Sequence, residues 1–179
     1  MDELLIDRLR RGDRHAADAL VERHLDDLYR FLRHLTRHAQ EAEDLAQRTL
    51  LRALRGIGGF DGQSSLRTWL HRIAYREFLN WRRGRRLVVA LDPRRPHVDP
   101  GYDAFESRER LVDAIGRLSP KVGAAFLLVE VQELTIEEAA QALRVPAGTI
   151  KSRLDQARHR LRRLLAEPAP ENAHAPEPL

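Results

Sequence analysis

The chain has 179 residues, of which 42% are hydrophobic and 32% are charged, a length that suits one or two small domains. No run reaches the roughly 18 apolar residues that span a bilayer, and the N-terminus lacks a secretory signal, so we expect a cytoplasmic protein without membrane insertion. The absence of cysteine excludes disulfides, thiolate metal sites and cysteine nucleophiles.

The net charge is +4, but the basic residues gather in two windows, residues 67–86 and 144–163. Each window holds seven basic residues and one acid, so together they carry +12, whereas the other 139 residues carry −8. Two basic patches on an otherwise acidic chain predict two points of contact with a polyanion such as nucleic acid.

Apolar residues recur at spacings of three and four along most of the chain, which predicts an all-α fold. We expect helices at 2–11, 14–37, 40–55, 64–83 with a break at Gly84, 107–117, 120–132, 136–143 and 147–165. The composition of residues 85–106, which include three prolines, predicts a flexible linker. A proline-rich tail at 167–179 is expected to be disordered. The chain therefore divides into two small helical domains, residues 1–84 and 107–166.

Projecting residues 42–57 at 100° per residue separates a core face from a polar face. The expected core face consists of Ala42, Leu45, Ala46, Thr49, Leu50, Ala53 and Ile57. Leu51 falls on the opposite side, among Asp44, Gln47 and Arg48. One interpretation is a protein docking surface, and the other is an ordinary exposed leucine. Periodicity alone leaves both open.

The next helix sets Arg72, Arg76 and Arg83 in a stripe with Tyr75 nearby, a combination that suits single-stranded or distorted nucleic acid. Glu77 falls in the apolar face, and a buried pair with an arginine is its only evident explanation. The glycine-rich loop before this helix contains one aromatic residue, Phe60, which either accommodates an unstacked base or plugs the core. The residues of the loop by themselves favour the core.

Near the C-terminus, Thr135 and Glu138 have the spacing of a capping box, which starts a short helix. The helix that follows carries an apolar face made of Ile150, Leu154, Ala157, Leu161 and Leu164. Two helices joined by about four residues fit a helix-turn-helix, whose second helix enters the major groove of DNA. An amphipathic helix with a solvated basic side is the alternative, which the capped first helix and the short turn make less favourable.

Three segments now stand in one order: AEDLAQRTLLRAL at 42–54, FDGQSSLRTWLHRIAYREFLNWRR at 60–83 and LTIEEAAQALRVPAGTIKSRLDQARHRL at 134–161. In these segments the chain resembles the extracytoplasmic-function sigma factors of bacterial RNA polymerase, within the sigma-70 superfamily. The resemblance covers most of the chain. It implies a protein that binds the polymerase core and directs promoter recognition, DNA strand opening and transcription initiation. An anti-sigma factor is a further partner that it implies.

By this resemblance three sets of residues receive roles. Contact with the polymerase core falls to Asp44, Gln47, Arg48 and Leu51. Contact with the minus-ten element falls to Phe60, Asp61, Ser64, Ser65, Arg72, Tyr75, Arg76, Asn80 and Arg83. Contact with the minus-thirty-five element falls to Thr149, Lys151, Ser152, Arg153, Gln156 and Arg160. The family often has Asn where Arg76 stands and Asp where Asn80 stands, so these departures raise the positive charge around the residues assigned to the minus-ten element.

Two rival functions remain to be weighed. His34 and His38 have a spacing that can hold a metal, but the segment is full of solvated charges and no His-Glu-x-x-His element is present. We therefore expect no metal, no cofactor and no enzymatic activity. The stronger alternative is a one-component helix-turn-helix repressor, which would bind duplex DNA by itself as a dimer.

The charge pattern carries a last expectation about the free protein. Two basic patches tethered to an acidic remainder through a proline-containing linker can fold toward each other and mask their own basic faces. We therefore expect the isolated chain to bind promoter duplex weakly.

Overall fold

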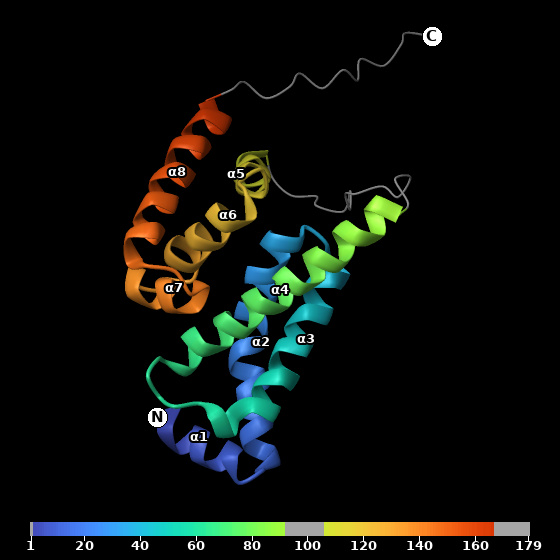
Figure 1. Ribbon diagram of the computed structural model, residues 1–179, viewed down its shortest axis with the longest axis vertical. Coiled ribbons are helices and arrows are strands. Elements are labelled where there is room, and N and C mark those ends of the chain that lie inside the picture. The colour runs from blue at the N-terminus through green and yellow to red at the C-terminus, as the bar shows by residue number, and fades with distance from the viewer. Residues whose placement is uncertain (1, 92–105, 167–179) are drawn as a thin grey trace.

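The computed structural model describes residues 2–91 and 106–166, and within these ranges every regular element is a helix (Figure 1). The all-α prediction is confirmed. The elements are α1 (Asp2–Arg10), α2 (Arg14–Thr36), α3 (Ala39–Gly56), the 3-10 turn η1 (Ile57–Gly59), α4 (Leu66–Leu91), α5 (Glu106–Gly116), α6 (Pro120–Phe126), the π-helical turn η2 (Leu127–Val131), α7 (Ile136–Leu143) and α8 (Ala147–Ala166).

The first domain is a bundle of α2, α3 and α4, with α1 across one end (Figure 1). Asp13 begins α2 because its carboxylate accepts hydrogen bonds from the backbone amides of His15 and Ala16, at 2.9 and 3.3 Å. Arg37 ends the helix in the left-handed region, at φ 60°. The fully buried side chains that hold the bundle together include Leu20, Leu28, Phe31, Leu32, Leu45, Leu66, Leu70 and Phe78.

The break expected at Gly84 is wrong, because α4 continues without interruption to Leu91. A single glycine inside a helix costs about 1 kcal/mol relative to alanine, which tertiary contacts can offset. Arg85 supplies such contacts: its guanidinium lies 5.3 Å from the centre of the Trp81 ring, and its Nη1 lies 3.6 Å from Oε1 of Glu41. Arg85 thus packs on the first domain rather than opening a linker.

The rest of the expected linker, residues 92–105, and the expected tail, residues 167–179, lie outside the described residues. The boundaries assigned to the domains therefore stay predictions.

The second domain comprises α5 to α8. The helix expected over 120–132 changes character after Phe126, where the amide of Gln132 bonds to the carbonyl of Leu127 at 2.8 Å and closes a π-helical turn. The capping box is confirmed: Thr135 Oγ1 accepts from the Glu138 amide at 3.1 Å, and Glu138 Oε2 accepts from the Thr135 amide at 2.9 Å. On α8, four of the five expected core residues are buried and Leu164 is half-buried.

Candidate nucleic-acid and protein interfaces

The two faces expected for α3 are both confirmed. All seven residues of its expected core face are buried. On the opposite side Asp44, Gln47, Arg48 and Leu51 are exposed, and Leu51 keeps 52% of its surface accessible. The polar neighbours bond only along their own helix: Gln47 donates to Glu43 Oε1 and Arg48 to the carbonyl of Asp44, both at 3.4 Å. An apolar side chain with a polar surround is therefore open to a partner.

Glu77 has the partner that the sequence suggested. Its carboxylate is buried on α4, and its Oε1 lies 3.1 Å from Nη1 of Arg52 on α3. Removing one member of a buried ion pair usually costs 3–5 kcal/mol, because the remaining charge stays desolvated. The side chain of Arg52 is 58% exposed, so the cost here lies below that range. The pair ties α4 to α3 beneath their outer faces.

Phe60 plugs the core, as the loop residues favoured. It is 4% exposed, its ring centre lies 5.2 Å from that of Trp69, and its carbonyl accepts a hydrogen bond from Arg10 Nη2 at 2.7 Å. Its ring is therefore not accessible to a base in this arrangement. Gly62 makes the turn that follows, with φ at +73°, a value that glycine adopts without strain.

The polar residues of this loop divide into two kinds. Ser65 caps α4, because its Oγ accepts from the Thr68 amide at 3.1 Å. Asp61 is exposed and its Oδ1 accepts from the Gln63 amide at 3.1 Å, whereas Ser64 is half-buried. Asp61 is thus more open to a ligand than Ser64.

The cationic stripe of α4 is partly covered by α7. Arg76, Asn80 and Arg83 are exposed, but Arg72 is half-buried and its Nε donates to the carbonyl of Gln141 on α7 at 3.2 Å. Tyr75 is only 8% exposed, and burial raises the pKa of its hydroxyl. The expectation that the two domains fold toward each other agrees with this arrangement.

A polar network, which sequence reasoning did not single out, joins the two domains. Arg67 Nη2 on α4 lies 3.1 Å from Gln132 Oε1 and 3.4 Å from Asp27 Oδ2, and Gln132 Nε2 donates to the carbonyl of Asp27 at 3.4 Å. Gln132 is 3% exposed. In the sequence, only the position of Gln132 at the end of an apolar run indicated that it could be buried. That position does not reveal a partner 65 residues away.

His71 lies one turn after Arg67 on α4 and is buried against α2. Its Nδ1 donates to the carbonyl of Arg67 at 2.9 Å, and its ring meets Phe31 edge-on at 5.3 Å. Burial lowers the pKa of His71 to about 4, so the imidazole is neutral at neutral pH. It acts as a core residue that holds α4 to α2.

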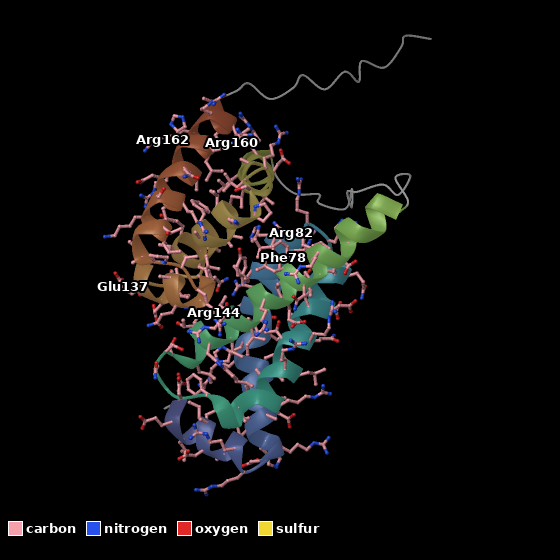
Figure 2. The ribbon with its side chains drawn as sticks, in the orientation of Figure 1. Phe78, Arg82, Glu137, Arg144, Arg160 and Arg162 are labelled. Atoms are coloured by element: carbon pink, nitrogen blue, oxygen red, sulfur yellow. The ribbon has the colours of Figure 1, made fainter. Side chains whose placement is uncertain are left out.

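On α8, the residues expected to face DNA are mostly open to solvent. Lys151, Ser152, Gln156 and Arg160 are exposed, and Thr149 is half-buried. Figure 2 shows Arg160 toward the C-terminal end of the helix.

Arg153 of α8 differs from these neighbours. It is half-buried, and its charge lowers the pKa of Tyr75 against the larger, opposite effect of burial. Arg153 therefore lies toward α4 rather than toward a DNA duplex.

Within residues 2–91 and 106–166, no three histidine or acidic side chains gather in a way that suits a metal ion. No helix in these ranges is long and apolar enough to cross a membrane.

Comparison with known proteins accounts for both domains. The family description "Sigma-70 region 2" matches residues 20–88, and "Sigma-70, region 4" matches residues 108–161. The RNA polymerase sigma-H factor of Pseudomonas aeruginosa is 32% identical, over 92% of this chain and 93% of that protein. The ECF RNA polymerase sigma factor SigM of Mycobacterium tuberculosis is 36% identical, over 86% of this chain and 79% of its own length.

A solved structure agrees. The sigma factor RpoE of Bartonella quintana, in complex with the anti-sigma factor NepR, is 29% identical with a TM-score of 0.73, over 85% of this chain and 98% of that one. The chain therefore belongs to the extracytoplasmic-function sigma factors of the sigma-70 family.

Proposed function

We propose that the two domains of this promoter-directing sigma factor act through three separate surfaces. The outer face of α3 binds the polymerase core, the cationic face of α4 binds and opens the minus-ten element, and α8 reads the minus-thirty-five element. The protein works in the cytoplasm and catalyses no reaction itself. The repressor alternative is not favoured, because both family matches and the full-length relatives are sigma factors.

The observation that carries this proposal is the exposure of Leu51 on a helix whose core face is already complete. A large apolar side chain left in water beside Asp44 and Gln47 contributes nothing to folding of the free chain. Buried by a partner, it has the character of a binding hot spot, which is worth about 2 kcal/mol or more.

The DNA-binding surfaces rest on charge and exposure together. Lys151 and Gln156 project from the first half of α8, as base-edge or phosphate contacts require. On α4, the exposed cations Arg76 and Arg83 flank Asn80, which suits the backbone of a displaced single strand.

The contact between α4 and α7 makes the free protein a poor DNA binder in this proposal. Arg72 and Tyr75 reach promoter DNA only after α7 has moved away, and the polymerase core would hold the domains apart. An anti-sigma factor would oppose that separation. A structural relative described in complex with such a factor supports this extension.

The test is transcription with sigma-free core polymerase on a panel of genomic promoters, with the protein alone as the binding control. We expect promoter-specific transcripts with core, and weak, salt-sensitive duplex binding without it. Tight, salt-resistant, sequence-specific binding by the protein alone, without transcription, would favour the repressor.

Variants separate the two DNA contacts. Lys151→Ala should reduce promoter binding about tenfold, whereas Arg76→Ala should leave binding nearly intact and lower permanganate reactivity of the opened strand. Both side chains are exposed, so their loss leaves the fold intact. Arg162→Ala, an equally exposed cation on α8, is the control.

A further inference from the structure

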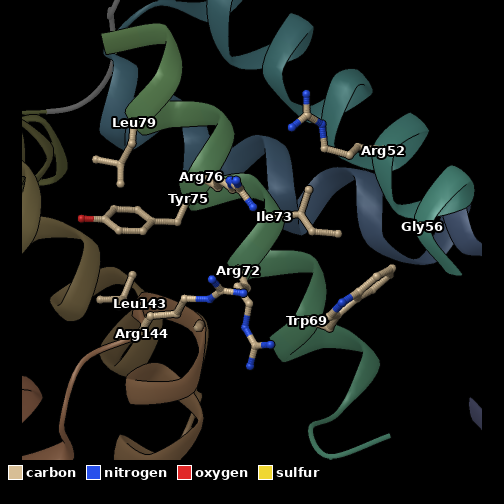
Figure 3. A pocket seen from close by; sticks show the side chains of 11 residues that line it. Arg52, Gly56, Trp69, Arg72, Ile73, Tyr75, Arg76, Leu79, Leu143 and Arg144 are labelled. Atoms are coloured by element: carbon tan, nitrogen blue, oxygen red, sulfur yellow. The ribbon is translucent and has the colours of Figure 1, made fainter. Parts of the chain in front are cut away.

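A cavity of about 600 Å³ lies where α3, α4 and α7 meet, and Figure 3 shows it from close by. Trp69, Ile73 and Leu79 of α4 and Leu143 of α7 form the apolar part of its wall. The volume falls within the range typical of sites for small organic ligands. Because α7 supplies part of the wall, the cavity exists only while the two domains are packed together.

Four arginines line the same cavity, and no acidic residue does. Arg52 shares its charge with Glu77. Among the described residues no carboxylate pairs with the other three, Arg72, Arg76 and Arg144.

Figure 3 shows Arg144 reaching from the end of α7 toward Arg72 on α4. Gathering like charges beside an apolar wall is unfavourable, and a bound anion would offset that repulsion.

We propose that this cavity binds a small organic phosphate and that the bound phosphate holds the two domains closed. The apolar body of the ligand lies on Trp69, Ile73 and Leu143, and its phosphate lies among the guanidinium groups of Arg72, Arg76 and Arg144. Guanidinium groups bind phosphate through paired hydrogen bonds, and the indole offers a flat apolar surface. A nucleotide and an alkyl phosphate share this chemistry.

The regulatory consequence rests on the proposed function, whereas the binding itself does not. Arg72, Tyr75 and Arg76 belong to the surface assigned to the minus-ten element and also line the cavity. The phosphate and the opened promoter strand therefore exclude each other. A ligand present at 100 times its dissociation constant shifts the balance toward the closed form about 100-fold, if it does not bind the open form.

Gly56 allows the cavity to be filled without removing any side chain. It lines the cavity, its φ of −98° suits any residue, and an added Cβ would meet only Trp69, at an ordinary contact distance of 3.9 Å. Gly56→Leu should therefore occupy space that the ligand needs. Arg144→Gln removes one exposed cation from the wall, and Arg162→Gln, which removes an exposed cation of α8 outside the cavity, is the matched control for charge.

The experiment is isothermal titration of the full chain with ADP and with decyl phosphate, which represent the two ligand sources. Adenosine and inorganic pyrophosphate test the apolar body and the phosphate separately. We expect micromolar binding of ADP or decyl phosphate, at least tenfold weaker binding of adenosine and pyrophosphate, and at least tenfold loss in Arg144→Gln and in Gly56→Leu. Arg162→Gln should bind like the unaltered chain.

Absence of binding by both ADP and decyl phosphate would overturn the proposal. So would equal affinity for pyrophosphate, or an equal loss in Arg162→Gln, because either result indicates general attraction of anions to a basic surface. Unfolding by urea shows whether each variant retains the fold.

A second readout tests the closed state with core polymerase and promoter, in the absence of nucleoside triphosphates. Adding the phosphate before core should lower permanganate reactivity at least tenfold, and Arg144→Gln should be insensitive. Unchanged reactivity despite tight binding would refute the regulatory half of the proposal. Failure to open any promoter without ligand would refute the proposed function and leave the titration result standing.

Discussion

The outer face of α3 and the cationic face of α4 belong to neighbouring helices of one domain, yet they differ in what covers them. On α3, Leu51 and its polar neighbours are open to solvent. On α4, Tyr75 is buried and Arg72 bonds to the backbone of α7. A partner can therefore reach α3 while the domains are closed, but it can reach all of α4 only after they separate.

In the proposed function, this difference orders the events of initiation. The polymerase core would bind a surface that is already available, and DNA would bind one that must first be uncovered. The hydrogen bonds that hold α7 and its domain on α4 include Arg72 to Gln141, Thr68 to Glu138 at 3.4 Å, and the network around Arg67. A hydrogen bond of this kind contributes about 1 kcal/mol.

Of the changes considered, acid should lower the free energy of unfolding the most, and it acts on α4 through His71. The pKa of His71 is about 4 in the folded chain and about 6.5 when unfolded, so between these values the unfolded chain binds more protons. The contribution of His71 to the free energy of unfolding is therefore fully present above about pH 6.5 and is lost as the pH drops toward 4. The full loss from this one group is about 3 kcal/mol.

Urea unfolding between pH 7.5 and 4 measures this loss. His71→Leu should flatten the decline, whereas His159→Leu, an exposed histidine of the second domain, should not. If the free energy of unfolding fell equally with pH in the unaltered chain and in His71→Leu, protonation of His71 would not be the cause of the decline.

The α3 side is tested by Leu51→Ala. We expect affinity for core polymerase to fall about 30-fold, equivalent to about 2 kcal/mol, because the side chain becomes buried in the complex. The free energy of unfolding should change by less than about 0.5 kcal/mol. Leu4→Ala removes another exposed leucine, 71% accessible on α1, and should bind core normally in the same titration. Equal loss in both variants would remove α3 from its assigned role.

The smallest effect should come from loosening the contact between domains. Gln132→Ala removes the bonds to Arg67 and Asp27, which should open the closed form about fivefold, or about 1 kcal/mol. Gln141→Ala is the matched control, because only its backbone carbonyl meets Arg72.

The chain lacks cysteine, so a pair of introduced cysteines can carry dyes that report the distance between domains. Gln132→Ala should lower energy transfer and raise binding of promoter duplex by the free chain. An unchanged distance would mean that this network does not hold the domains together.

The sequence by itself determined the helices, both faces of α3 and the capping box of α7. These features depend on residues three or four positions apart, which a helix places side by side, and so the pattern needs no distant partner. The exposure of Leu51 follows from the same geometry. The buried pairing of Glu77 was also anticipated, although its partner Arg52 was not.

Only the tertiary structure decided how far α4 extends, what Phe60 contacts and which part of the cationic stripe is covered. Arg85 packs against a helix more than 40 positions earlier in the chain, and Tyr75 lines a cavity together with Leu143 of the other domain. Local periodicity gives no measure of such contacts, because the desolvation of a residue depends on every segment that packs around it. Local pattern therefore located the surfaces proposed for this sigma factor, and packing between its domains decided which of them are open.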